Sequence, residues 1–188
     1  MNMNQTPEQS RILAVSLSSR GFGYAVMEEN SRLIDYGKKI INKKKNARSL
    51  VQIEKLIARN QPTALVLQDV NAKGSRRVPR IKRLHRNVVA LAKHHKIKMG
   101  KISGTELRTA LLGDAKETRH EMAEILAQQF PDELASRLPP KRKFYNSEDA
   151  RMDIFMAVAI SISYKTPASK LPSETAPATV MARRFGII

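Results

Sequence analysis

The chain has 188 residues, of which 41% are hydrophobic, and this is enough to bury the core of one domain. Its 34 Lys and Arg residues against 17 Asp and Glu residues give a formal net charge of +17, which favours a polyanionic partner, with nucleic acid the first candidate. Cysteine is absent, which excludes a disulfide framework, a thiolate metal site and a cysteine nucleophile.

The N-terminal residues 1–10 are polar and contain neither the apolar core of a secretory signal nor an Arg-rich transit peptide. No later stretch approaches the roughly 18 consecutive apolar residues of a membrane-spanning helix. We therefore expect a cytoplasmic protein without a membrane partner, in which residues 1–10 form a polar N-terminal extension.

Three consecutive segments after this extension have the pattern of antiparallel strands. Arg11–Leu17 and Phe22–Met27 are rich in apolar and β-branched residues, and Ser18-Ser19-Arg20-Gly21 between them suits a tight hairpin turn. A second turn at Asn30-Ser31 leads to Arg32–Ile41, whose alternation of apolar and polar residues indicates a third strand. These segments predict a meander of three antiparallel strands.

The next segments alternate between helix and strand. Ala47–Arg59 has apolar residues at helical spacing, and Thr63–Leu67 is a short apolar run that follows a proline. An apolar stripe from Ile81 to Leu91 predicts a second helix, and Ile97–Ile102 predicts a last strand. Strands that are separated by helices indicate parallel crossover connections.

Three further helices are predicted at Thr105–Leu112, Thr118–Phe130 and Ser147–Tyr164. In the last of them we expect Ser147 to cap the N-terminus, with Glu148 and Asp149 in the first turn, where acidic side chains favour the helix dipole. Residues 165–188 are rich in proline and poor in apolar side chains, so we expect them to form a flexible C-terminal tail.

Basic residues are concentrated in the middle of the chain, because no acidic residue occurs from Val70 to Thr105. The apolar stripe of the predicted helix leaves its basic residues to point elsewhere, so an ordered helix presents them. A later segment, residues 141–145, combines cations with two aromatic rings, which is typical of a segment that stacks on bases, although a solvated loop is equally compatible. The residues that we expect to bind nucleic acid are Lys73, Arg76, Arg77, Arg80, Lys82, Arg83, Arg86, Lys93, Lys141, Arg142 and Lys143.

The order of these elements and three of the segments resemble the RuvC-type Holliday-junction resolvases of the ribonuclease-H-like superfamily. The segments that carry the resemblance are residues 12–19 with Gly23-Tyr24-Ala25, residues 65–69 and residues 153–160. The resemblance implies an α/β domain over residues 11–164, in which three antiparallel strands are followed by parallel strands and helices flank the mixed sheet.

In that family an Asp on the first strand, a Glu at the end of the fourth strand and Asp residues on the last helix hold two divalent metal ions. The resemblance places these acids at Ser16, Gln68, Asp153 and Met156, so three of the four are missing. A hydroxyl or carboxamide oxygen is a weak neutral ligand for magnesium, and a thioether is not a useful one. We therefore expect a degenerate active site with no bound metal and no other cofactor.

Nearby acids offer a second interpretation. Asp69 would reach the site only if its strand ends before it, because neighbouring residues of a strand point to opposite faces. Asp149, Asp153 and Met156 would share one face of the predicted helix, so two carboxylates could flank one Mg²⁺ or Mn²⁺ ion. In the alternative, Glu148 and Asp149 only stabilise the helix N-terminus and Asp153 pairs with a nearby basic residue.

Our leading hypothesis is a RuvC-like nucleic-acid-binding protein that binds branched or duplex DNA without cleaving it. The first alternative is a magnesium- or manganese-dependent junction endonuclease with Asp69, Asp149 and Asp153 as rearranged catalytic residues. A second alternative is a structural component of a larger nucleoprotein particle. The resemblance favours DNA over RNA, and it is compatible with a homodimer, although the sequence indicates no interface.

Overall fold

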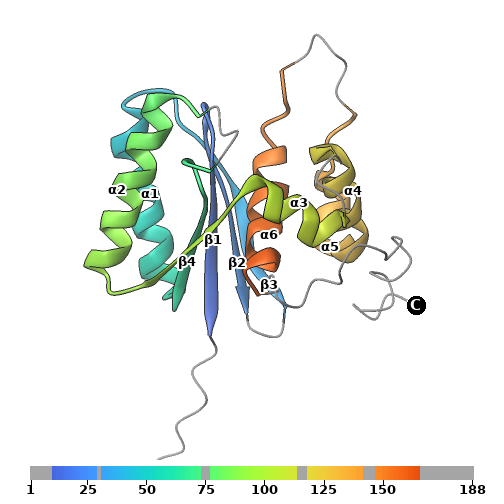
Figure 1. Ribbon diagram of the computed structural model, residues 1–188, viewed down its shortest axis with the longest axis horizontal. Coiled ribbons are helices and arrows are strands. Elements are labelled where there is room, and N and C mark those ends of the chain that lie inside the picture. The colour runs from blue at the N-terminus through green and yellow to red at the C-terminus, as the bar shows by residue number, and fades with distance from the viewer. Residues whose placement is uncertain (1–9, 29–30, 73–76, 114–117, 142–146, 166–188) are drawn as a thin grey trace, which may run out of the picture.

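The computed structural model describes residues 10–28, 31–72, 77–113, 118–141 and 147–165. Five strands form one mixed sheet between two layers of helices (Figure 1). The strands are β1 (Arg11–Leu17), β2 (Gly21–Glu28), β3 (Leu33–Ile40), β4 (Ala64–Gln68) and β5 (Lys98–Ile102). The helices are α1 (Lys45–Asn60), α2 (Pro79–His94), α3 (Gly104–Leu112), α4 (Arg119–Gln129), α5 (Pro131–Leu134) and α6 (Met152–Lys165), with a 3₁₀ turn at Ala135–Arg137.

The sheet has the strand order β3-β2-β1-β4-β5. Strands β1, β2 and β3 are antiparallel, whereas β4 and β5 run parallel to β1. The β1–β2 turn is closed by a hydrogen bond of 2.9 Å from the Ser18 N–H to the Gly21 carbonyl, as the predicted hairpin requires. The predicted mixed sheet, with three antiparallel strands followed by parallel ones, is confirmed.

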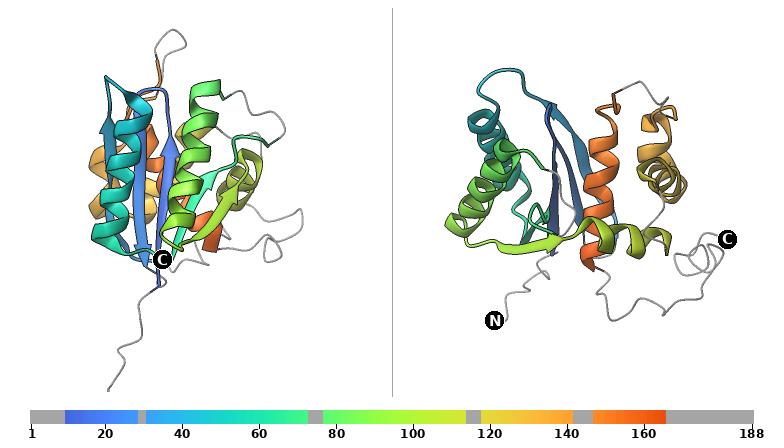
Figure 2. Two further views of the ribbon diagram at one scale, coloured as in Figure 1. Left: turned by 90° about the vertical axis from the view of Figure 1, so that its left-hand side faces the viewer. Right: turned by 45° about the horizontal axis from the view of Figure 1, so that its top comes forward.

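The two faces of the sheet have separate hydrophobic cores. On one face α1 and α2 cover the apolar side chains Leu13, Val15, Leu65 and Leu67. On the other face α6 covers the alternate positions, which include Ala14 and Val66, and α3, α4 and α5 lie beyond α6 (Figure 2). Because the side chains of a strand alternate between faces, the position after Val15 and the position after Leu67 both belong to the α6 face.

Helix α6 lies between the sheet and the outer helices, and most of its residues are buried. Its first turn comes very close to β2, because a Cβ atom on Gly23 would lie only 2.0 Å from the backbone oxygen of Asp153. Glycine at this position therefore allows the first turn of α6 to pack on the sheet, opposite the end of β1.

The last predicted helix begins five residues later than expected. The carboxylate of Asp149 accepts hydrogen bonds from the backbone N–H of Arg151, at 2.8 Å, and from the guanidinium of the same residue. Residues 149–151 therefore form a turn, and α6 starts at Met152. The predictions that Ser147 caps this helix and that Glu148 and Asp149 lie in its first turn are wrong. The short helices at residues 131–137 were not predicted.

Two predicted segments lie almost entirely outside the described residues, because these exclude residues 1–9 of the N-terminal extension and residues 166–188 of the C-terminal tail. Within the described part of the chain, none of the helices combines the length and the apolar character that crossing a lipid bilayer requires.

Candidate nucleic-acid interface and acid site

The four positions at which the resemblance expects acids lie at the carboxyl ends of β1 and β4 and in the facing turns of α6. Ser16 lies near the end of β1 and Gln68 ends β4, and the carboxyl ends of these parallel neighbours lie side by side. Both side chains belong to the α6 face of the sheet. Asp153 and Met156 lie in the first turns of α6, and Asp153 packs over Gly23, the antiparallel partner of Ser16. The fold therefore brings together the four positions at which the resemblance expects acids, and one of them is an acid.

These side chains do not fit a divalent metal ion. Magnesium and manganese favour several carboxylate oxygens, and Asp153 supplies the only carboxylate among the four positions. Ser16 and Met156 are 3% and 4% exposed, so water would not easily complete a coordination shell beside them. Within the described residues, no three His, Cys, Asp or Glu side chains form a group that could hold a metal ion.

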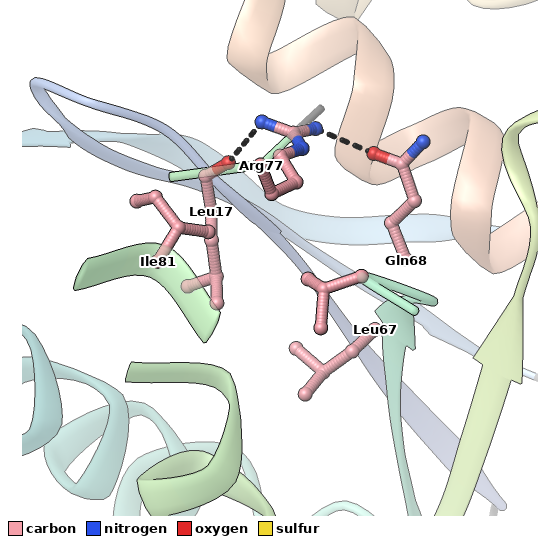
Figure 3. Close-up of a pocket in the computed structure, with 6 residues that line it drawn as sticks. Leu17, Leu67, Gln68, Arg77 and Ile81 are labelled. Carbon is pink, nitrogen blue, oxygen red and sulfur yellow. Dashed lines mark hydrogen bonds between the residues drawn. The ribbon is translucent and has the colours of Figure 1, made fainter. Parts of the chain in front are cut away.

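A guanidinium group lies at the carboxyl ends of β1 and β4. The Nη2 of Arg77 donates a hydrogen bond of 2.6 Å to Gln68 Oε1, and its Nη1 donates one of 3.1 Å to the carbonyl oxygen of Leu17 (Figure 3). Arg77 thereby joins the end of β4 to the end of β1. It also lines a small recess together with Leu67 and Ile81. The amide oxygen at the fourth-strand acid position is thus already bound to a cation.

The charge of Arg77 is not neutralised by a direct ion pair, since no acidic oxygen of the described residues lies within salt-bridge distance of it. Burial lowers the pKa of Arg77, and the positive charge of Arg119 lowers it further. Asp153 and Glu148 act in the opposite direction, so both carboxylates lie near enough to interact electrostatically with the guanidinium.

Asp153 is in an unfavourable environment for an ionised carboxylate. Burial raises its pKa above the ordinary value, and the charge of Glu148 contributes in the same direction. The hydroxyl of Ser18 and the guanidinium groups of Arg20 and Arg119 partly offset this effect. The one carboxylate left at the acid positions therefore costs the folded state free energy when it is ionised.

We expect Asp153→Asn to raise the melting temperature at pH 7. The pKa of Asp153 is higher in the folded than in the unfolded chain, so wild-type stability recovers as pH falls through the folded-state pKa. The advantage of the variant should therefore shrink as the pH is lowered toward 4, which thermal unfolding across this pH range would measure.

Asp149→Asn is the matched control and should lower the melting temperature at pH 7. The hydrogen bonds from Arg151 lower the pKa of Asp149 to about 2, so its ionised form stabilises the fold above its unfolded-state pKa. Equal melting temperatures for wild type and Asp153→Asn at pH 7 would contradict the unfavourable burial of Asp153.

The other two candidate acids lie apart from Asp153. Asp69 follows the end of β4, and its carboxylate accepts a hydrogen bond of 2.9 Å from the backbone N–H of Asn71. Burial lowers the pKa of His85, a residue of α2, and the charge of Asp69 partly opposes this effect, so Asp69 lies near the α2 side of the sheet. Asp149 is bound to Arg151 outside α6, so the expected shared helix face of Asp149 and Asp153 does not form.

The predicted nucleic-acid-binding residues separate into two groups. Arg77 and Arg80 point toward the β1–β2 turn, where Arg80 Nη2 donates hydrogen bonds to the carbonyl oxygens of Ser18 and Ser19. Lys45 of α1, which the sequence analysis did not select, donates to the same Ser19 carbonyl at 3.0 Å. These cations bind the backbone of the β1–β2 turn and fix its position.

The second group lies on the outer face of α2. Its exposed members are Lys82, Arg83, Arg86 and Lys93, whereas Ile81, Leu84 and Val88 are buried against the sheet. Lys141 is exposed as well, and Lys73, Arg76, Arg142 and Lys143 lie outside the described residues.

The two helical layers differ in charge. Helix α2 contains no acidic residue, and the neighbouring α1 contains four basic residues and one acidic residue. On the other face of the sheet, acidic residues outnumber arginines in the outer layer of residues 119–137. Among the described helices, the basic residues are therefore concentrated in α1 and α2.

Two arginines near Asp153 were also missed by the sequence analysis as site residues. Arg20 lies in the β1–β2 turn, and Arg119 begins α4, yet the charges of both act on Asp153. No spacing in the sequence relates positions about one hundred residues apart. Their proximity follows from the packing of α4 beside α6 and from the fold of the hairpin.

The sequence matches no protein-family model and none of the curated proteins. Solved structures do match the fold. Thermus thermophilus RuvC aligns with a TM-score of 0.61 at 13% identity, covering 85% of this chain and 95% of that one. T. thermophilus RuvC in complex with a Holliday junction substrate aligns with a TM-score of 0.59 at 11% identity, covering 82% and 92%. The yeast mitochondrial Holliday junction resolvase aligns with a TM-score of 0.56 at 14% identity, covering 84% and 80%.

Proposed function

We propose, from the premise that the chain has a RuvC-type ribonuclease-H-like fold, that it binds branched or duplex DNA and does not cleave it. One observation carries the proposal. Where this fold's acid positions meet, the guanidinium of Arg77 is hydrogen-bonded to Gln68, and Asp153 is the single carboxylate. The position that would need a divalent cation thus holds a protein cation.

The absence of cleavage follows from the chemistry of phosphodiester hydrolysis with two metals. Such a site must bind both ions, activate a water molecule and stabilise the leaving oxygen. One buried carboxylate of raised pKa does not supply the negative charge for this task. Asp69 and Asp149 do not complete the set, since each is engaged elsewhere.

Binding is supported by the exposed cations of α2. Basic side chains that contact phosphates displace the counterions condensed on DNA, which provides affinity that does not depend on base sequence. The alignment with the T. thermophilus RuvC that was solved with a Holliday junction substrate supports DNA, and branched DNA in particular, as the partner. A homodimer and a role within a larger nucleoprotein complex remain predictions.

The proposal is tested by incubating the protein with labelled four-way junction and duplex DNA, with and without Mg²⁺ or Mn²⁺, and scoring binding and cleavage together. We expect a steeply salt-dependent complex with both substrates and no cleavage product. Matched RNA duplexes in the same assay would show whether DNA is preferred. If the protein cleaves DNA with magnesium and Asp153→Asn abolishes this cleavage, the proposal is wrong and the alternative, an endonuclease with rearranged catalytic acids, takes its place.

The same assay locates the binding surface. Arg83→Glu together with Arg86→Glu should weaken binding by roughly tenfold or more for every sequence tested, because backbone contacts do not read bases. Arg137→Glu reverses an exposed arginine on the opposite, acidic layer and should have little effect. If Arg137→Glu cost as much binding free energy per reversed charge as the double variant, only total charge would matter and α2 would not be the binding surface.

A further inference from the structure

Three arginines from distant parts of the chain lie near enough to Asp153 to interact with it electrostatically. They are Arg20 in the β1–β2 turn, Arg77 just before α2 and Arg119 at the start of α4. Arg119 Nη1 lies 2.8 Å from Glu148 Oε2, and Arg20 donates a hydrogen bond to the Glu148 backbone oxygen. Among the described residues, Arg77 donates to two neutral oxygens and Arg20 to one, whereas Arg119 is paired with a carboxylate.

Arg77 retains hydrogen-bonding capacity. A guanidinium has five N–H groups in a planar fork, and among the described residues Arg77 uses two of them, in its bonds to Leu17 and Gln68. Both acceptors are uncharged, so the bonds fix the position of the group without neutralising it. A cation that is positioned in this way and has unused donors is suited to an anionic oxygen ligand.

The surroundings of Arg77 favour a negative ligand. Burial and the nearby charge of Arg119 both disfavour the charged guanidinium, and an anion between the arginines would relieve these effects. Helix α2 begins two residues later at Pro79 with no side-chain cap, so the positive end of its dipole lies close by. Asp153 and Glu148 limit how much negative charge the site accepts, which favours a singly charged group.

We propose that Arg77 replaces the divalent cation of this fold and binds one phosphodiester group of the nucleic-acid backbone at the edge of the sheet. The inference rests on the proposed function, since it assigns a phosphate contact to the DNA that α2 binds. Because Arg77 immediately precedes α2, this phosphate and those on the outer face of α2 can belong to one duplex arm. The degenerate acid site is then a part of the binding surface.

The test compares Arg77→Met with Arg137→Met, which removes the same group from the opposite layer. Binding of a labelled duplex is measured by fluorescence anisotropy at several salt concentrations. Arg77→Met should weaken binding on the order of tenfold and reduce the salt slope by about one, because one charge-assisted phosphate contact is lost. Arg77→Lys, which keeps the charge but loses the fork, should fall between wild type and Arg77→Met. Wild-type affinity and slope in Arg77→Met would overturn the inference.

A second measurement follows DNA binding by the wild-type protein itself. In the ¹⁵N-labelled wild-type protein, the Nε–H signal of Arg77, assigned by its loss in Arg77→Lys, should shift when the duplex is added. Movement of the α2 amide signals without movement of the Arg77 signal would refute the phosphate contact while leaving the proposed function intact. If no signal moves and no complex forms, the proposed function fails and the inference fails with it.

Discussion

Ser16→Asp, Gln68→Glu and Met156→Asp, introduced together, should not create a tight Mn²⁺ site while Arg77 is present. The guanidinium would pair with the new carboxylates and exclude the ion, since it already donates a hydrogen bond of 2.6 Å to Gln68. Adding Arg77→Ser should leave four carboxylates at these positions without the guanidinium that binds Gln68 in the wild type, and several carboxylates are the ligands that hard divalent cations favour.

The quadruple variant should be less stable than wild type without metal, because Ser16 and Met156 are buried and their replacement places unpaired charges in the interior. Saturating Mn²⁺ should then raise its melting temperature by about 5–10 °C, because a ligand that binds only the folded state stabilises it. The triple variant should show a much smaller change. Calorimetric titration and thermal unfolding with and without Mn²⁺ provide the measurements.

Metal binding, and not cleavage, is the appropriate readout, because cleavage also needs groups that orient the ligands and the attacking water. Asp153→Asn in the quadruple background is the control and should weaken Mn²⁺ binding strongly. If the triple variant binds Mn²⁺ as tightly as the quadruple variant, then Arg77 does not occupy the position of the cation.

Gly23→Ala should destabilise the protein by about 3 kcal/mol, near the upper end of what overpacking costs in a core. The added Cβ would lie 2.0 Å from the backbone oxygen of Asp153 and 2.2 Å from its carbonyl carbon. Neither atom can move without displacing the first turn of α6, so the helix has to shift away from β2. Urea unfolding monitored by circular dichroism measures the loss.

Gly37→Ala on the adjacent strand β3 is the matched control. The three atoms nearest to its Cβ would all belong to the side chain of Tyr24, at 3.0 to 3.2 Å, and a small ring displacement can relieve that contact. We expect a clearly smaller loss of unfolding free energy than for Gly23→Ala. A Gly23→Ala protein with wild-type stability would mean that α6 does not pack on β2 at this point.

The strands were predictable because their signals are local. The apolar run of Arg11–Leu17 and the turn at residues 18–21 each depend on neighbouring residues, and both were found within a residue of the predicted bounds. The start of α6 was not predictable in this way. Asp149 can stabilise a helix N-terminus from the first turn, or it can accept a hydrogen bond from the N–H of Arg151 in a turn. Both arrangements are compatible with the same short sequence.

The expectation that acids are missing at Ser16, Gln68 and Met156 comes from the sequence alone, because comparison with a family pattern needs only the order and spacing of residues along the chain. The place of Arg77 cannot be found in that way. In the sequence it is one of many basic residues before a helix, whereas in the fold its guanidinium joins the ends of β1 and β4. Parallel strands bring together residues that are far apart in the chain, so the contacts at their ends exist only once the sheet has formed.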